Sequence, residues 1–84
     1  MQVSDRVVEA LDEVFSYAKD VEDWIVIKKE LLKCLPSEER KSFSTRDPIT
    51  KKQRMNQFEL HVAGLWAARS GRPVIFKDYE KSEK

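Results

Sequence analysis

The sequence predicts an all-α protein, a small three- to four-helix domain with a long C-terminal helix followed by an extended tail. Apolar residues recur every three or four positions through most of the chain. The chain has only two glycines and three prolines, which disfavours a series of β-hairpins. Its 84 residues suit one domain. We therefore expect a single helical domain over residues 1–79 and a mobile C-terminal tail over residues 80–84.

The first predicted helix covers residues 5–19. Ser4 is a favoured N-cap, and Asp5 complements the helix dipole in the first turn. The apolar stripe consists of Val7, Val8, Leu11, Val14, Phe15 and Ala18. A basic surface nearby would relieve the mutual repulsion of four acids on the opposite side: Asp5, Glu9, Asp12 and Glu13.

The second predicted helix covers residues 21–35, with Asp20 as its cap and Pro36 after its end. Its core face consists of Val21, Trp24, Ile25, Leu31, Leu32 and Leu35, with the stem of Lys28 between them. A strand over residues 24–27 is the alternative, because these residues favour β structure, but the longer helical period outweighs it. Val26 points away from the core face, which indicates an interface. A short helix over residues 38–43 should follow, capped by Ser37 and anchored by Phe43.

The long helix is predicted over residues 48–70. Asp47 is a favoured N-cap, Pro48 suits the first helical position, and Gly71 suits the left-handed residue after the last turn. Its core stripe consists of Met55, Phe58, Val62, Leu65, Trp66 and Arg69.

The opposite side of the long helix is also apolar or small, and it carries Leu60, Ala63, Gly64 and Ala67. A glycine inside a helix costs about 1 kcal/mol relative to alanine, so the close approach of a second backbone would explain it. After Gly71, the segment Val74–Ile75–Phe76 is extended by composition. It could pack over the helices or pair with the same segment of a second subunit.

The charge is distributed unevenly, although the net charge is only +1. Residues 1–30 carry eight acids and four bases, whereas residues 31–84 carry seven acids and twelve bases. The segment 40–54 contains one acid, Asp47, and six bases: Arg40, Lys41, Arg46, Lys51, Lys52 and Arg54. The predicted helices 38–43 and 48–70 are joined by a short linker, and basic and amide side chains occupy the start of the second helix. This layout is typical of a helix-turn-helix, although the linker is longer than usual and lacks glycine. Binding of DNA or RNA through this basic segment is therefore the alternative function.

His61 and Cys34 are the two side chains whose chemistry could support metal binding or catalysis. His61 is the only histidine, and it has no partners at metal-ligand spacing, so we interpret it as a residue at the edge of the core. Cys34 is the only cysteine, and a lone cysteine at the end of an apolar helix is usually a small buried residue. A nucleophile would need His61 beside it. No phosphate loop, Cys-x-x-Cys or Gly-x-Ser-x-Gly motif is present, so we expect no enzyme activity, cofactor or metal.

These observations lead to one functional hypothesis and one alternative. A single cysteine suits a reducing compartment, and we find no signal peptide or membrane span, so we expect a cytoplasmic protein without membrane contact. The hypothesis is a small regulatory protein that binds a protein partner and forms a homodimer. Its expected interface consists of Val26, Leu60, Gly64, Ala67, Val74 and Phe76.

Overall fold

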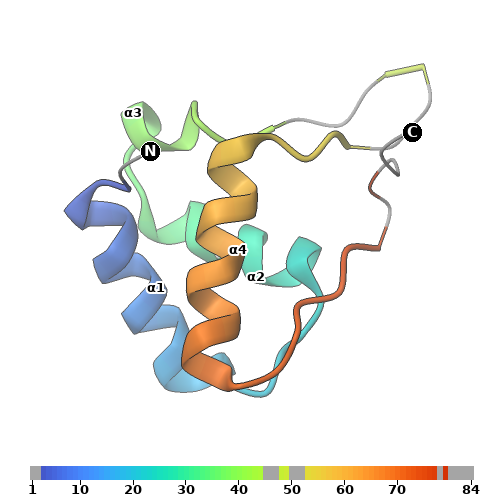
Figure 1. Cartoon of the computed structure of the whole chain (residues 1–84). Helices are drawn as coiled ribbons and strands as arrows, with labels where there is room; N and C mark the ends of the chain where they lie inside the picture. Colours follow the sequence, from blue (N-terminus) through green and yellow to red (C-terminus); the bar gives the residue numbers. More distant parts are fainter. Residues whose placement is uncertain (1–2, 45–47, 50–52, 78, 80–84) are drawn as a thin grey trace.

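The computed structural model describes residues 3–44, 48–49, 53–77 and 79. These residues form four helices and no sheet: α1 (Asp5–Ala18), α2 (Trp24–Cys34), α3 (Ser37–Arg40) and α4 (Gln57–Ser70). The predicted all-α class is therefore confirmed. Helices α1 and α4 lie side by side with α2 behind them (Figure 1). The rings of Phe15 in α1 and Trp66 in α4 meet edge to face at 5.2 Å between centroids.

Helix α1 agrees with its prediction. The Ser4 hydroxyl accepts a hydrogen bond from the Val7 amide at 3.4 Å, as an N-cap should. The centre of the predicted stripe is fully buried: Val7, Leu11 and Val14. Both tryptophans, Trp24 and Trp66, are also fully buried, so the three longer helices meet in one core.

Helix α2 begins at Trp24, three residues later than the predicted start at residue 21. Asp23, not Asp20, is the N-cap, and its carboxylate accepts from the Ile25 amide at 3.1 Å. The Val21 carbonyl accepts from the Trp66 indole at 3.1 Å, and the Glu22 carbonyl accepts from the Ile75 amide at 2.7 Å. Both carbonyls are therefore used in tertiary contacts instead of a first helical turn. The alternative of a strand over residues 24–27 is wrong, since these residues are helical.

Helix α3 is shorter than the predicted 38–43. It spans Ser37–Arg40, and Pro36 occupies the cap position without a side-chain hydrogen bond, so the expected Ser37 cap is wrong. Phe43 lies beyond the helix but is buried as predicted, with its ring edge to face with Phe58 at 5.1 Å.

The predicted start of the long helix is not confirmed. Pro48 lies in a turn, residues 53–56 are not helical, and α4 begins at Gln57; Asp47 lies outside the described residues. Asn56 is the observed N-cap, and its side-chain oxygen accepts from the Glu59 amide at 2.7 Å. Gln53 is buried and its backbone pairs with Tyr79, so the chain before Asn56 does not continue the helix axis. The C-terminal end agrees with its prediction: Gly71 adopts φ 75°.

After Gly71 the chain turns back and runs in the opposite direction to α4 (Figure 1). We call residues 72–77 and 79 the C-terminal strap. Its extended part pairs with the chain ahead of α2, because the Ile75 amide donates to Glu22 and the Ile75 carbonyl accepts from the Trp24 amide at 2.8 Å. The segment Val74–Ile75–Phe76 thus packs over the helices of its own chain. Both the amide and the carbonyl of Ile75 are used in this pairing. Within the described part of the chain, no helix has the length and apolar composition that crossing a membrane would require.

Replacing Asn56 with alanine should destabilise the fold by about 1 kcal/mol, because the N-cap acceptor is lost. Asp47→Ala should cost less than Asn56→Ala, because α4 begins at Gln57 and takes its cap from Asn56. Urea unfolding followed by circular dichroism measures both changes. The opposite order, with Asp47→Ala the more damaging, would show that the helix begins near Pro48.

Candidate functional site

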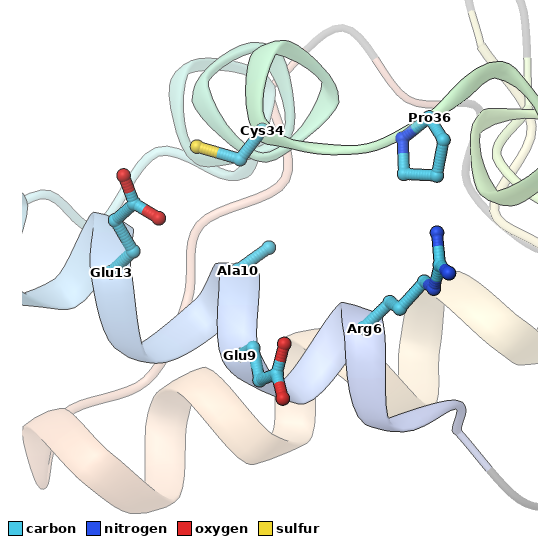
Figure 2. A pocket seen from close by; sticks show the side chains of 6 residues that line it. All are labelled: Arg6, Glu9, Ala10, Glu13, Cys34 and Pro36. Carbon is cyan, nitrogen blue, oxygen red and sulfur yellow. The ribbon is translucent and has the colours of Figure 1, made fainter.

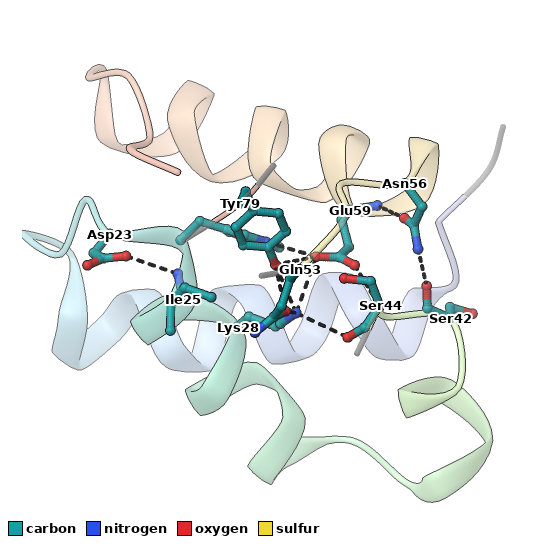
Figure 3. Close-up of polar contacts among 10 residues, drawn as sticks. Asp23, Ile25, Lys28, Ser42, Ser44, Gln53, Asn56, Glu59 and Tyr79 are labelled. Atoms are coloured by element: carbon teal, nitrogen blue, oxygen red, sulfur yellow. Dashed lines mark hydrogen bonds and ion pairs between the residues drawn. The ribbon is translucent and has the colours of Figure 1, made fainter. Parts of the chain in front are cut away.

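A buried cluster of polar side chains lies between α2, α4 and the strap (Figure 3). Its centre is an ion pair in which the Lys28 ammonium lies 3.5 Å from a Glu59 carboxylate oxygen, and both side chains are almost completely removed from solvent. The Lys28 ammonium also donates to the Tyr79 hydroxyl at 2.8 Å, to the Ser44 carbonyl at 3.2 Å, and to the Gln53 side-chain oxygen. One lysine therefore connects four separate segments of the chain.

The Glu59 carboxylate accepts further hydrogen bonds inside this cluster. Its donors include the Tyr79 hydroxyl at 2.7 Å, the Trp24 indole at 3.1 Å and the Ser44 amide. Burial by itself would raise the pKa of Glu59, but hydrogen bonds from Ser44, Trp24 and Tyr79 outweigh it and lower the pKa below its ordinary value. Glu59 is therefore an ionised acceptor at neutral pH.

Tyr79 completes the cluster from the C-terminal strap. Burial, followed by the hydrogen bond and the charge of Glu59, raises the pKa of Tyr79 well above its ordinary value, so the phenol stays neutral. It can then donate to Glu59 while it accepts from Lys28. The Lys28, Gln53, Glu59 and Tyr79 side chains are all buried, so the cluster is shielded from solvent. Its evident role is to hold α2, α4 and the strap in one arrangement.

Burial of Glu59 sets the rotation of α4 about its own axis. The residues three, four and seven positions after Glu59 are also buried, so one face of α4 is turned into the core. Ala63, expected on the second apolar side, lies on this core face instead. The solvent-exposed residues of the opposite side form what we call the outer face of α4: Gln57, Leu60, His61, Gly64 and Ala68.

The outer face of α4 is hollowed and uncharged. The hollow on α4 measures about 630 Å³ and is lined by Gln57, Leu60, His61, Gly64 and Leu65. A second hollow, of about 350 Å³, lies elsewhere on the molecule. Leu60 is 49% exposed on the outer face of α4. The only charged residues in α4 are Glu59, which is buried, and Arg69, which pairs with Asp12 of α1 at 2.9 Å. An exposed face that combines Leu60 with small residues and has no acid, lysine or arginine suits an interface.

The structure groups only part of the predicted interface. Leu60 and Gly64 lie on the outer face, with the half-buried Ala67 at its edge, but Val26 belongs to α2, where it is 43% exposed. The strap carries the other two predicted residues, Val74 and Phe76. Val74 packs against the core, and the Phe76 ring lies 6.5 Å from that of Trp24. Sequence reasoning missed Gln57 and Ala68 and placed the exposed His61 at the core edge, because the rotation of α4 depends on a buried acid.

The basic segment is only partly described. Arg46, Lys51 and Lys52 lie outside the described residues, as does Thr50. Arg40 and Lys41 are exposed at the end of α3, and the Arg40 guanidinium donates to the Leu35 carbonyl at 2.9 Å. Arg54 is exposed, but neither it nor Gln53 opens a helix, and Gln53 is buried. The expected helix-turn-helix layout is therefore wrong at these two positions, while nucleic-acid binding itself stays a prediction.

Cys34 lines a separate hollow between α1 and the end of α2, together with Arg6, Glu9, Ala10, Glu13 and Pro36 (Figure 2). The expectation that it is buried is wrong, since the thiol sits at the exposed end of α2. Partial desolvation raises the pKa of the Cys34 thiol, and nearby carboxylates raise it further, so it is a weaker nucleophile than an ordinary cysteine. His61 lines the other hollow, and no metal-binding group of three acids, histidines or cysteines occurs among the described residues.

Two arginines near the end of α4 and in the strap form ion pairs with acids of the first half of the chain. Arg69 pairs with Asp12, and Arg72 reaches Asp20 at 3.4 Å and Glu22 at 3.2 Å. These contacts fasten the end of α4 and the strap to the acidic first half. Part of the charge asymmetry is thus neutralised within one chain.

Comparison of the chain with protein-family models, with curated proteins and with solved structures finds no match. The function is therefore inferred from the buried cluster and from the outer face of α4.

Glu59→Gln should destabilise the protein by about 3 kcal/mol, because it leaves the buried Lys28 ammonium without its counter-charge. The matched control is Lys33→Met in the Lys33–Glu30 pair, whose 3.3 Å distance is shorter but whose lysine is 71% exposed. This control should lose less than about 1 kcal/mol. Equal losses in urea unfolding would show that the buried pair does not hold the fold.

The difference in stability between the wild type and Glu59→Gln should depend on pH. Because the Glu59 pKa is lowered in the folded state, the ionised carboxylate stabilises the fold above the ordinary glutamate value of about 4.3, and this contribution disappears as the pH falls through the folded pKa. The difference in unfolding free energy between wild type and Glu59→Gln should therefore shrink in acid. A difference that stays constant between neutral pH and about pH 3 would contradict the assignment.

Proposed function

We propose that the protein is a small non-enzymatic regulatory protein that acts through protein–protein binding, as a homodimer joined by the outer face of α4. The observation that carries this proposal is the uncharged hollow of about 630 Å³ on a helix whose other face is already buried. The exposed side of a surface helix is normally polar and charged, whereas a helix that is apolar all round is usually covered on all sides. In a chain with 37% charged residues, such a face favours a covering partner.

Gly64 supports the same proposal from backbone energetics. A methyl group added at Gly64 would have no neighbouring atom within 4 Å, and Gly71 is the only described glycine with a positive φ. Neither packing within the chain nor backbone conformation therefore requires glycine at position 64. Its cost of about 1 kcal/mol in a helix finds no compensation in the single subunit. A second helix that crosses closely over Gly64 would supply that compensation.

A second copy of the chain fits this face better than a charged partner. In a twofold-symmetric dimer the same patch meets itself, so any charge near the axis would face a like charge. The outer face has no formally charged side chain at neutral pH, and this repulsion is absent. The residues three and four positions from Gly64 would surround the crossing point: Leu60, His61, Ala67 and Ala68. A domain of this size also gains stability from association, since its own core is limited.

Sedimentation equilibrium at low micromolar concentration should show a dimer for the wild type and a monomer for Leu60→Lys and Gly64→Glu, because each change places a charge in the crossing region. Tyr17→Lys is the matched control, since Tyr17 is 60% exposed on α1 and outside this face. It should remain dimeric. A wild-type monomer, or a dimer that both α4 variants leave intact, would overturn the proposal.

Gly64→Ala distinguishes an effect on the stability of the single subunit from an effect on the strength of the dimer. In the monomeric Leu60→Lys background it should stabilise the fold by about 0.5–1 kcal/mol, because alanine favours the helix and its methyl group meets nothing. In the otherwise wild-type chain it should weaken the dimer roughly tenfold, which corresponds to about 1.4 kcal/mol of lost contact. A dimer unchanged or tightened by Gly64→Ala would show that no helix crosses there.

A further inference from the structure

Resting on the proposed function, we infer that His61 makes the dimer sensitive to pH, so that protonation of its imidazole separates the subunits. His61 is exposed on the outer face of α4 and lies three residues from Gly64, beside the crossing point. In the free subunit the imidazole can take up a proton in contact with water. In the dimer it would be enclosed by the two copies of an uncharged face, where a cation is costly without an acidic partner.

Among the residues that the structure describes, no acid forms an ion pair with His61. The four residues three and four positions away on α4 are uncharged: Gln57, Phe58, Gly64 and Leu65. On the neighbouring helix α1, the Asp12 carboxylate is held by Arg69 at 2.9 Å, and Asp5 is exposed to solvent in the first turn. The nearest acid on α4, Glu59, is turned into the core and paired with Lys28. A second copy would bring the same uncharged residues.

The sequence makes this sensitivity specific to one position. Histidine is the side chain that ordinarily changes charge between pH 5 and 8, and the chain has only one. Each dimer therefore has two such groups, and its dissociation takes up as many as two protons. Because each proton is taken up only on separation, the dissociation constant of the dimer rises as the pH falls.

Sedimentation equilibrium at about pH 7.5 and about pH 5.5 tests the inference on the full chain, with His61→Gln as the neutral control. The expected result is a dimer that weakens by at least roughly tenfold in acid for the wild type, while His61→Gln forms a dimer of equal strength at both pH values. His61→Lys, which carries its charge permanently, should be monomeric at both. Far-ultraviolet circular dichroism at the lower pH should show the helices intact.

The outcomes distinguish this inference from the proposed function. A wild-type dimer of unchanged strength at the lower pH would overturn the role of His61 and leave the homodimer standing. A pH response that persists in His61→Gln, or that coincides with loss of helix, would also overturn it. A wild-type monomer at both pH values would instead remove the homodimer and the inference with it.

Discussion

The buried ion pair between Lys28 and Glu59 is the interaction on which the rest of the structure depends. Neither charge can be left alone in the core, so each must find its counter-charge and enough hydrogen bonds to replace water. Those bonds come from Trp24, Ser44 and Tyr79, which lie far apart in the sequence. The pair therefore selects one arrangement of α2, α4 and the strap. Its main contribution is specificity, because an apolar pair of the same size could stabilise the core equally well.

The orientation of α4 follows from that pair and determines which surface remains available. With Glu59 turned inward, Leu60, His61 and Gly64 are turned outward, although two of them are not residues that a solvent-facing helix usually prefers. The same helix thus buries one acid among apolar core residues and exposes a face that has no carboxylate, ammonium or guanidinium group. This face is the surface on which the proposed homodimer depends.

Ion pairs at the surface complete the arrangement without controlling it. Arg69 and Arg72 connect the end of α4 and the strap to acids of the first half of the chain. These side chains are at least partly exposed, so each pair contributes little free energy. The backbone hydrogen bonds of Ile75 and the buried hydroxyl of Tyr79 hold the strap more firmly, since they are directional and Tyr79 is shielded from water.

Local signals in the chain were sufficient for α1, for the end of α2 and for the left-handed end of α4, because Ser4, Pro36 and Gly71 act on their nearest neighbours. They were insufficient at the start of α4. Asp47–Pro48 is the N-terminal signal that predicted the start of the helix, whereas Asn56, a second residue of a favoured capping type that was not predicted, is the observed N-cap. Burial of Gln53 and Glu59 beside Lys28, a contact between distant segments, selected the second. The same long-range contact placed His61 and Gly64 on one outer face, which helical periodicity cannot show when a charged residue occupies a core position.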